Sequence, residues 1–357
     1  MAALKFFQSL LLYPLTLLIA SAGILAFLAA WTDPAESGLI TWAGFVMPAI
    51  LLANLCVAIY WIFRKSGWAG VPLAVILLNS GYLTSIFQIS SPVPVSPHDT
   101  TVIRIASYNV GGFRSWEKQD TYYPIAAYFR EQQINIACFQ EYSERTKLKA
   151  DTLSKLLGLP YHAVEYLPGS TANGSAIYSK FPILSHGRLP LASKSNDAMW
   201  ADIRINGQTI RVVSCHLETT NFYSKRKALK KKEFDNSDPQ QLYSVYNDIS
   251  ATLLQSSSIR ASQADIVREM ADTTSLPLII CGDFNDPPSS YTYRQVKGEL
   301  KDSFRSKGKG YGYTFRGLHR LLRIDYVLYS PAFECLDYRS EDLSWSDHKP
   351  IICLLRL

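Results

Sequence analysis

The stretch Ile279-Ile280-Cys281-Gly282-Asp283-Phe284-Asn285-Asp286 decides the fold of this chain. An apolar run that ends at Gly-Asp-x-Asn predicts a short buried strand, which delivers a carboxylate and a carboxamide to one edge of a sheet. Asp283 would supply charge and basicity there, and Asn285 would supply a neutral oxygen and an amide donor. Two such groups can hold a water molecule beside a hard cation, so the other parts of such a site are expected elsewhere in the chain.

Charged residues are spread very unevenly along the 357 residues. Residues 1–90 contain only Lys5, Asp33, Glu36, Arg64 and Lys65, and nearly all other charges lie beyond residue 98. This division indicates an apolar head that precedes an ordinary globular body. The net charge of +6 permits an anionic substrate or surface without pointing to one. The six cysteines stand singly, without the Cys/His spacing of a zinc site, and are interpreted as small buried hydrophobic residues.

Three apolar segments fill the head, and each has roughly the 20 residues that a helix needs to cross the hydrocarbon core of a bilayer. They are Leu10–Trp31, Leu39–Phe63 and Trp68–Ile89. Tryptophan stands near the segment ends, as in the aromatic belt of a membrane interface. We therefore predict that residues 1–90 form a membrane anchor of three transmembrane helices. The alternative is a set of helices buried in a protein core.

The few charges of the head also predict its orientation in a plasma or inner membrane. Lys5 precedes the first segment, and Arg64-Lys65 lie between the second and the third. Since basic residues favour the cytoplasmic side, the N-terminus is expected inside, and three crossings place the residues after 90 in the periplasm or outside the cell. Residues 91–100 are rich in Pro and Ser, which predicts a semi-extended linker that does not pack.

From residue 101 to 357 the pattern changes to short apolar strands that alternate with amphipathic helices. The predicted helices are Tyr122–Gln133, Leu148–Leu157, Pro239–Leu254 and Ile259–Ala271. The predicted strands are Thr101–Tyr108, Ile134–Phe139, Tyr161–Tyr166, Ser175–Ser179, Ile183–Leu189, Ala198–Ile205, Thr209–Leu217, Leu276–Cys281, Gly312–Phe315, Arg323–Tyr329, Phe333–Tyr338 and Pro350–Leu355. So many strands predict an α/β domain of two sheets with helices outside them.

Polar side chains of a similar kind lie at the ends of several of these strands. They are Asn109, Glu141, His216, Asp283, Asn285, Asp325, Asp347 and His348. Any one of them alone would more simply be a turn or cap residue. Together they are typical of a catalytic site that is gathered from many strand ends at a rigid sheet edge.

Seven blocks of sequence around these residues resemble the endonuclease/exonuclease/phosphatase superfamily, the DNase I-like metal-dependent phosphoesterases. The blocks occur in the expected order between residues 101 and 357, and they are Ser107-Tyr108-Asn109-Val110, Phe139-Gln140-Glu141, the run from Gly174 to Ile183, Cys215-His216-Leu217, Gly282-Asp283-Phe284-Asn285, the run from Arg323 to Leu328, and Ser346-Asp347-His348-Lys349-Pro350. The resemblance implies a four-layer α/β/β/α sandwich, here preceded by the three membrane helices.

The resemblance also implies a divalent cation, Mg²⁺ or Mn²⁺. Glu141 would be its principal ligand, with Asn109 and Asp347 beside it. Ligation by oxygen alone suits a hard cation that keeps several of its water molecules.

By the same resemblance, the remaining strand-end residues are catalytic. Asp283 would orient or deprotonate the attacking water, and Asn285 would hold that water or a phosphate oxygen. His348 would contact the phosphoryl group, steadied by Asp325, and His216 would donate to a phosphate oxygen or assist the leaving group. The physical task is in-line displacement at phosphorus. The sequence leaves open whether Asp283 or His348 takes the proton.

A basic insertion, residues 217–258, follows His216 at the rim of the expected site and includes Lys225-Arg226-Lys227. We expect Asn173, Lys225 and Arg226 to bind substrate, and the alternative for the insertion is a solvated charged loop. A basic lid would suit the backbone of a nucleic acid and an anionic lipid surface equally well.

These observations predict a membrane-anchored, metal-dependent hydrolase of phosphodiester or phosphomonoester bonds. The substrate stays open between nucleic acid, for a nuclease in the periplasm or outside the cell, and a phospholipid headgroup, for a sphingomyelinase- or inositol-phosphatase-like enzyme. The alternative without catalysis is a silent, membrane-tethered binding module. The complete set of strand-end residues argues against it, since a binding module has no need of all of them.

Overall fold

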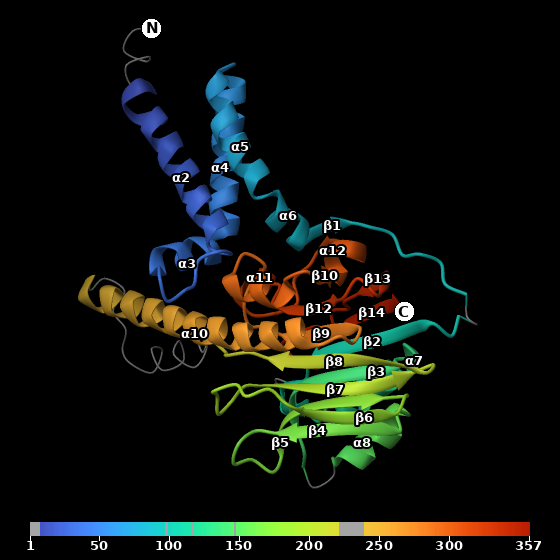
Figure 1. The fold of residues 1–357 in the computed structure, drawn as a ribbon. Helices are drawn as coiled ribbons and strands as arrows, with labels where there is room; N and C mark the ends of the chain where they lie inside the picture. The colour runs from blue at the N-terminus through green and yellow to red at the C-terminus, as the bar shows by residue number, and fades with distance from the viewer. Residues whose placement is uncertain (1–7, 97–98, 116, 146–147, 221–238) are drawn as a thin grey trace. The chain divides into compact units, whose positions relative to one another are not determined.

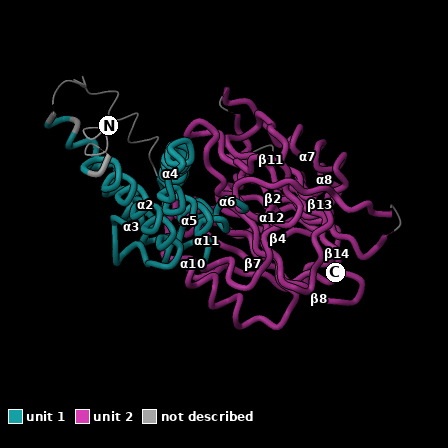
Figure 2. Tube along the Cα trace, turned by 90° about the horizontal axis from the view of Figure 1, so that it is seen from above, with its two compact units in different colours: residues 1–84, 221–261, 287–294 teal, residues 85–220, 262–286, 295–357 magenta. Residues whose placement is uncertain are grey.

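The computed structural model describes residues 8–96, 99–115, 117–145, 148–220 and 239–357. The chain forms two compact units (Figure 2). Unit 1 consists of Met1–Thr84, Asn221–Ala261 and Pro287–Arg294, and unit 2 consists of Ser85–Thr220, Ser262–Asp286 and Gln295–Leu357. Unit 1 therefore combines the apolar head with two segments from later in the chain.

The apolar helices of the head belong to unit 1. They are the π-helical turn η1 (Gln8–Leu12), α2 (Tyr13–Leu28), α3 (Gly38–Phe45), α4 (Met47–Phe63), the 3-10 turn η2 (Gly67–Ala69) and α5 (Gly70–Leu78), while α6 (Ser80–Ile86) runs into unit 2. By length and composition, one helix among the described residues can cross a membrane by itself, Leu10–Leu28. Up to three spans exist if each of two bent helix pairs counts as one span, and these pairs are Gly38–Phe45 with Met47–Phe63, bent by 71°, and Gly67–Leu78 with Ser80–Ile86, bent by 55°.

The expectation of three unbroken spans is therefore corrected for the second and third segments. The second is interrupted at Val46 (φ −95°, ψ 13°), because Pro48 has no N–H with which to continue the hydrogen-bond ladder of α3. The third is interrupted at Asn79, which a Ser-Gly pair of low helix propensity follows. The third segment also ends early, since Phe87–Ile89 form strand β1.

Small and polar residues hold α2 against α4 and α5. Gly23 has room only for hydrogen, because a Cβ there would collide with Val75 and press on Asn54. Asn54 Nδ2 donates to Ile19 O (3.1 Å), and Asn79 Nδ2 donates to Gly23 O (3.2 Å). Close backbone approach and interhelical hydrogen bonds are the usual way to fasten helices in a lipid environment, where the hydrophobic effect between helices is weak.

Two six-stranded sheets form the body of unit 2 (Figure 1). The first sheet has the order β10 (Lys301–Asp302), β12 (Asp325–Tyr329), β9 (Leu278–Asp283), β8 (Gln208–His216), β7 (Asp197–Ile205) and β6 (Ile183–Arg188). The second has the order β13 (Glu334–Arg339), β14 (Ile351–Arg356), β2 (Val102–Asn109), β3 (Ile136–Ser143), β5 (Asn173–Ser179) and β4 (Tyr161–Tyr166). Strands β1 and β11 (Lys309–Tyr311) make a separate two-stranded sheet.

The helices outside the sheets are α7 (Tyr122–Glu131), α8 (Ala150–Leu157), α10 (Pro239–Thr273), α11 (Tyr291–Lys297) and α12 (Ser303–Lys307). An inner core lies between the two sheets and joins Ile105 of β2 to Ile279 of β9. A second core packs Phe129 of α7 and Leu153 of α8 on the outer face of the second sheet. The predicted α/β fold with two stacked sheets is thus confirmed.

Helix α10 is a single helix of 35 residues, where the sequence predicts two. Serines at 256–258 separate the two predicted helices, but serine is only a weak helix former and does not break a helix. Ser258 Oγ donates to Leu254 O (3.0 Å), so its hydroxyl is satisfied inside the helix. The helix contributes residues to both units, with the division after Ala261.

Two further expectations are corrected. The Pro/Ser segment after residue 90 does pack, because Val93 N donates to Leu336 O (2.8 Å), and just before it Ser90 N donates to Gly308 O (3.2 Å). Extended backbone can pair along a strand wherever its free N–H groups face outward. The expected strand at 312–315 is also displaced, since the observed strand is β11, directly before it.

Candidate active site

Four polar residues stand side by side across the first sheet. In the strand register, Asp197 of β7 lies opposite His216 of β8, which in turn lies opposite Asp283 of β9. Asp283 lies opposite Asp325 of β12, and all four side chains are buried. Three of the predicted catalytic residues are therefore neighbours in one row, with Asp197 as an unexpected fourth member.

Gly282 allows β9 to come this close to β8. Its φ of 128° is open to glycine and strained for other residues, and a Cβ there would collide with the backbone of Cys215. The Gly-Asp pair that ends the strand is therefore a packing requirement as well as a chemical one.

From the second sheet, Asn109 at the end of β2 reaches this row. Its Nδ2 donates to Asp283 Oδ2 (3.0 Å) and to Glu141 Oε1 (3.0 Å). Its Oδ1 accepts the N–H of Gly111 (3.2 Å). Asn109 therefore presents N–H groups to two carboxylates and links the site residues of the two sheets.

Glu141 lies at an irregularity of β3 and has a left-handed backbone, with φ 51°. Its side chain is 44% exposed, and its Oε1 lies 3.6 Å from His216 Nε2. Desolvation by itself would raise the pKa of Glu141, but the charge of His216 and the hydrogen bond from Asn109 outweigh it and lower the pKa. Glu141 is thus an ionised, accessible carboxylate, the kind of group that binds a hard cation.

His348 joins Asp325 and Asp283. Its Nδ1 lies 2.9 Å and 3.1 Å from the two carboxylate oxygens of Asp325, and its Nε2 lies 3.5 Å from Asp283 Oδ2. Burial by itself would lower the pKa of His348, but the charges of Asp325 and Asp283 reverse this and raise it well above its ordinary value.

Burial has the opposite effect on the pKa of Asp283. Desolvation raises the pKa of Asp283 to about 6, and the charge of Asp325 adds to this effect, while His348 opposes it. An imidazolium therefore stands beside a carboxyl group that titrates not far from neutral pH. Two groups whose pKa values are moved in this way are suited to acid–base work.

His216 has a partner that the sequence did not indicate, Asn196. Asn196 Nδ2 lies 3.3 Å from His216 Nε2 and donates to Leu217 O (2.9 Å). Asn285 Nδ2 donates to the same carbonyl oxygen (2.9 Å), while Asn285 N donates to Asp283 Oδ1 (2.8 Å). The amide nitrogen of Asn285 is therefore engaged, and its Oδ1, which has no partner among the described residues, is the atom that it can offer to a ligand.

The Ser346–His348 turn is fastened to the end of β2. Ser346 Oγ donates to Asn109 O (2.7 Å) and lies 3.3 Å from Asp347 Oδ1. Arg316 N donates to Asp347 O (2.8 Å), so the backbone of this turn is held from two sides. The half-buried carboxylate of Asp347 is in this way kept near Asn109, beside which the sequence predicts it as a metal ligand.

Of the three residues predicted to bind substrate, the structure describes only Asn173, and no contact joins it to this group. Asn173 begins β5, is exposed, and donates through its backbone N–H to Ser170 Oγ (2.9 Å). Lys225 and Arg226 lie outside the described residues.

Two sets of side chains could hold a cation. Asp283, Asp325 and His348 have ligand atoms within 4.8 Å of one another, and all three residues are buried. In that set, an ion would have to displace the proton of His348, whose positive charge already balances the carboxylates. The set that the sequence predicts, in contrast, includes the accessible carboxylate of Glu141, where no such exchange is needed.

Asn196 and Asp197 are the site residues that the sequence analysis missed. They stand at the start of a strand, whereas the residues that it found follow strand ends. In an antiparallel pair, the start of one strand faces the end of the next, as Asp197 faces His216. A polar Asn-Asp pair directly before an apolar strand was therefore the available signal. Ser175 Oγ donates to Asp197 Oδ1 (2.7 Å), and burial raises the pKa of Asp197.

Comparison with known proteins identifies the family of the chain. A family model described as the Endonuclease/Exonuclease/phosphatase family matches residues 106–348, and a model described as a domain of unknown function, DUF8431, matches residues 8–86. No curated protein sequence matches the chain.

Solved structures match most of the chain in fold. An endonuclease/exonuclease/phosphatase from Beutenbergia cavernae is 18% identical over 72% of this chain and 72% of its own, with a TM-score of 0.50. A humanized TDP2 of D. rerio with 14 mutations is 15% identical over 72% of this chain and 100% of its own, with a TM-score of 0.51. A family protein from Leptotrichia buccalis is 15% identical over 71% of this chain and 100% of its own, with a TM-score of 0.50. The family model spans more than half of the chain, from residue 106 to residue 348, and this range includes all the strand-end residues of the candidate site. The chain therefore belongs to the endonuclease/exonuclease/phosphatase family.

Proposed function

We propose that this chain is a membrane-anchored, divalent-metal-dependent phosphoesterase, which hydrolyses a phosphodiester or phosphomonoester bond by in-line attack of an activated water. The observation that supports it most is the pair formed by Asp283 and His348, whose Oδ2 and Nε2 lie 3.5 Å apart. Such a pair can take a proton from water and give one to an oxygen of the phosphoryl group. Membership of a family of phosphoester hydrolases supports the reaction class.

The protein residues divide the work as follows. Asp283 accepts the proton of the attacking water, and the Oδ1 of Asn285 holds that water in position. Asp325 orients the ring of His348 through Nδ1 and keeps it protonated, so that Nε2 faces the phosphoryl oxygens as a cation. His216, on the opposite side of Asp283 in the strand register, donates to a phosphate oxygen or to the leaving group.

The residues present fit a hard divalent cation. Glu141 and Asp347 would hold Mg²⁺ or Mn²⁺, since both offer oxygen and neither carboxylate is fully buried. A bound cation of this kind supplies positive charge to the non-bridging oxygens of the phosphoryl group. Asn109, the third predicted ligand, would offer its Oδ1, which also accepts from Gly111 N, while its Nδ2 holds Glu141 Oε1 in place.

Metal binding can be measured apart from catalysis, by calorimetric titration of the full chain with Mn²⁺. We expect Glu141→Gln to weaken binding by roughly tenfold or more, because it removes the charge of a direct ligand. We expect Asp325→Asn, which changes the buried set, to alter it by only a few-fold at most. A larger loss of Mn²⁺ affinity in Asp325→Asn than in Glu141→Gln would instead assign the cation to Asp283, Asp325 and His348.

The membrane anchor is proposed in residues 1–90 and the catalytic domain in residues 101–357, joined by residues 91–100. The apolar helix Leu10–Leu28 and the two bent helix pairs support an anchor by their length and composition. The distribution of basic residues favours a catalytic domain in the periplasm or outside the cell. Asn173, Lys225 and Arg226 remain the proposed contacts to substrate.

The substrate class can be tested directly. Full chain in detergent is incubated with Mg²⁺ or Mn²⁺ and with single-stranded DNA, RNA, sphingomyelin or phosphoinositides. We expect hydrolysis of at least one class and its loss in Asp283→Asn. Cleavage of none, while the metal still binds, would instead favour a catalytically silent binding module.

A further inference from the structure

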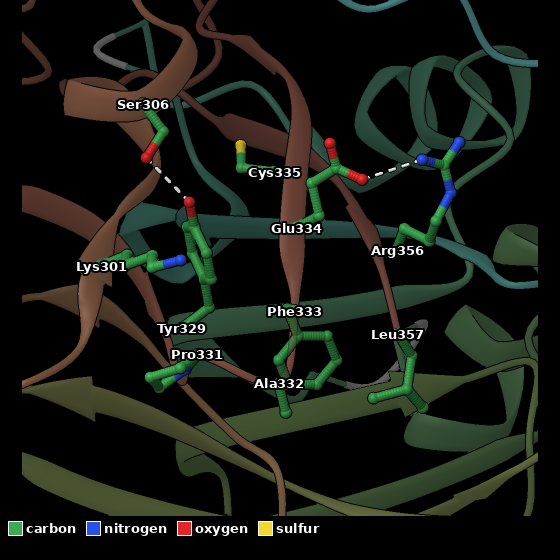
Figure 3. A pocket seen from close by; sticks show the side chains of 10 residues that line it. All are labelled: Lys301, Ser306, Tyr329, Pro331, Ala332, Phe333, Glu334, Cys335, Arg356 and Leu357. Atoms are coloured by element: carbon green, nitrogen blue, oxygen red, sulfur yellow. Dashed lines mark hydrogen bonds and ion pairs between the residues drawn. The ribbon is translucent and has the colours of Figure 1, made fainter.

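Two cavities of unit 2 lie apart from the candidate active site. The larger, of about 470 Å³, is shown in Figure 3. Most of the polar groups at its wall pair with one another, since Ser306 Oγ lies 2.7 Å from Tyr329 OH and Arg356 Nη1 donates to Glu334 Oε2 (2.8 Å), while Lys301 is exposed. This cavity therefore offers a ligand little that is not already satisfied.

The smaller cavity, of about 210 Å³, differs in this respect. Its wall consists of Phe304, Lys309, Tyr311, Gly312, Tyr313, Tyr338, Ser340 and Lys349, and we name it the Lys349 cavity. The wall contains four aromatic residues and two lysines but no acidic residue. Such a wall favours an anion and disfavours a cation.

Three polar groups of the Lys349 cavity lack partners among the described residues. The hydroxyl groups of Tyr338 and Ser340 are buried without a hydrogen-bond partner, and Tyr338 as a whole is only 8% exposed. Lys349 is also 8% exposed, and its Nζ lies 4.3 Å from the ring centre of Tyr313, with no carboxylate in ion-pair range among the described residues.

Unpaired buried groups of this kind are unfavourable, because each loses its hydration without gaining a protein partner. Tyr338 keeps its proton, since burial raises its pKa, and so its hydroxyl can donate. A bound anion would accept hydrogen bonds from both hydroxyl groups and pair with the charge of Lys349.

We propose that the Lys349 cavity is a binding site for a phosphate-bearing group. Lys349 supplies the buried charge, Lys309 adds a second charge at the exposed side, and the hydroxyls of Tyr338 and Ser340 donate hydrogen bonds. The neighbouring Asp342 carboxylate already accepts from Tyr313 OH (2.9 Å) and pairs with Arg316. Several converging donors suit an anion with three or more oxygens better than a halide or a single carboxylate.

The surroundings of the cavity indicate where such a group would come from. Strand β11, which carries Lys309 and Tyr311, pairs with β1, and β1 begins at the residue directly after α6. Phe87 and Ile89 of β1 are 52% and 88% exposed, and Tyr311 of β11 is 40% exposed. An apolar rim directly after the last apolar helix is typical of a membrane interface, so a lipid headgroup and free phosphate are the two sources to distinguish.

The Lys349 cavity is distinct from the candidate active site, although it lies beside it in the chain. His348 contacts Asp325 and Asp283, whereas the neighbouring Lys349 contacts Tyr313. A variant of the cavity can therefore be examined without changing a residue of the proposed catalytic pair.

The test is lysine-specific acetylation of the full chain, read residue by residue by mass spectrometry. In detergent with chelator, inorganic phosphate is expected to slow the acetylation of Lys349 by about fivefold or more and to leave exposed Lys301 unchanged. In bilayer discs of a phosphate-free glycolipid, added phosphatidic acid is expected to do the same if the headgroup is the source. Protection by phosphate alone would assign the site to the free anion, and protection by phosphatidic acid alone would assign it to the lipid.

Variants of the cavity and a matched control are then compared by calorimetric titration with the ligand that protects Lys349. Lys349→Met is expected to weaken binding about tenfold and Tyr338→Phe several-fold, while Lys301→Met, at the wall of the other cavity, changes nothing. The proposal is overturned if neither ligand protects Lys349 more than Lys301. It is equally overturned if chloride at the same ionic strength protects Lys349 as well as phosphate does.

Discussion

At the scale of single residues, Asp283 receives a hydrogen bond from Asn109 and another from the backbone N–H of Asn285. His348 stands beside it as a cation, and Asp325 stands on the far side of that imidazole as a second anion. The charge of Asp325 acts on both neighbours, because it raises the pKa of Asp283 as a like charge and that of His348 as an opposite charge.

This shared dependence gives a signed prediction for Asp325→Asn. Removing the charge lowers the pKa of Asp283 and also lowers the pKa of His348. Activity needs Asp283 deprotonated, which holds above its pKa, and His348 protonated, which holds below its pKa. The acid and the alkaline limbs of kcat/KM should therefore both move to lower pH, as a pH–rate profile would record.

The exposed carboxylate of Asp151 provides the control, since Asp151→Asn should leave both limbs in place. Limbs that move in opposite directions in Asp325→Asn, or that do not move, would show that Asp325 does not tune this pair.

At the scale of elements, β9 carries the site because Gly282 lets it approach β8. Gly282→Ala introduces both a strained φ and a collision with the backbone of Cys215, so we expect the unfolding free energy to fall by more than about 2 kcal/mol. Gly207→Ala is the matched control, because its φ is also positive but nothing lies within 4 Å of the added Cβ.

Thermal unfolding of the full chain in detergent measures the difference between the two variants. Gly282→Ala should lower Tm by roughly 4–8 °C and Gly207→Ala by about half as much or less. Equal shifts would mean that strain alone, and not the approach of the strands, explains the need for glycine at 282.

How far the elements could be predicted depended on whether local sequence carried the signal. Strands that end in Asn109, Asp283 and His216 were predictable, because an apolar run followed by polar residues is a local pattern. The bond from Asn196 to Leu217 O was not, since the Asn-Asp pair can mark a polar site but does not identify a partner 21 residues away.

The same limit applies to Arg323, which the sequence marked only as part of a motif. Its guanidinium is buried, donates to both carboxylate oxygens of Asp302 (2.6 Å and 2.9 Å) and also donates to Ser85 O (2.9 Å). Ser85 is 238 residues away, so only the fold reveals that Arg323 fastens the last turn of α6 to the α12 region.

At the scale of the whole molecule, unit 1 contains more than the apolar head. Trp42 Nε1 of α3 donates to Ser250 Oγ of α10 (2.8 Å), and Ser289 Oγ donates to Gly44 O (2.8 Å). The two later segments of unit 1 follow His216 and Asp283 in the chain. The apolar head, the proposed membrane anchor, therefore also packs against segments that follow two proposed catalytic residues in sequence.

The number of membrane crossings can be tested at the turn between α4 and η2. With the N-terminus inside, one crossing and three crossings both place the catalytic domain outside, but only three crossings place Ser66 inside. The adjoining Arg64 and Lys65 favour the inside, so Ser66→Cys in a Cys56→Ser background should react with thiol reagents only after the membrane is opened. If an impermeant reagent labels Ser66→Cys in intact cells, the three-crossing arrangement is wrong and a single crossing is supported.

The central claim is that this chain is a metal-dependent phosphoesterase whose acid–base pair contains Asp283. Its most direct test is the hydrolysis rate of the preferred phosphoester as Mg²⁺ or Mn²⁺ is titrated into chelator-treated full chain, for the unaltered protein, Asp283→Asn and Lys301→Met. We predict a saturable rise with metal in the unaltered protein and in Lys301→Met, and a rate lower by about 10²–10⁴ in Asp283→Asn at every metal concentration. Hydrolysis that persists without metal, or that survives in Asp283→Asn within a few-fold, would contradict the claim.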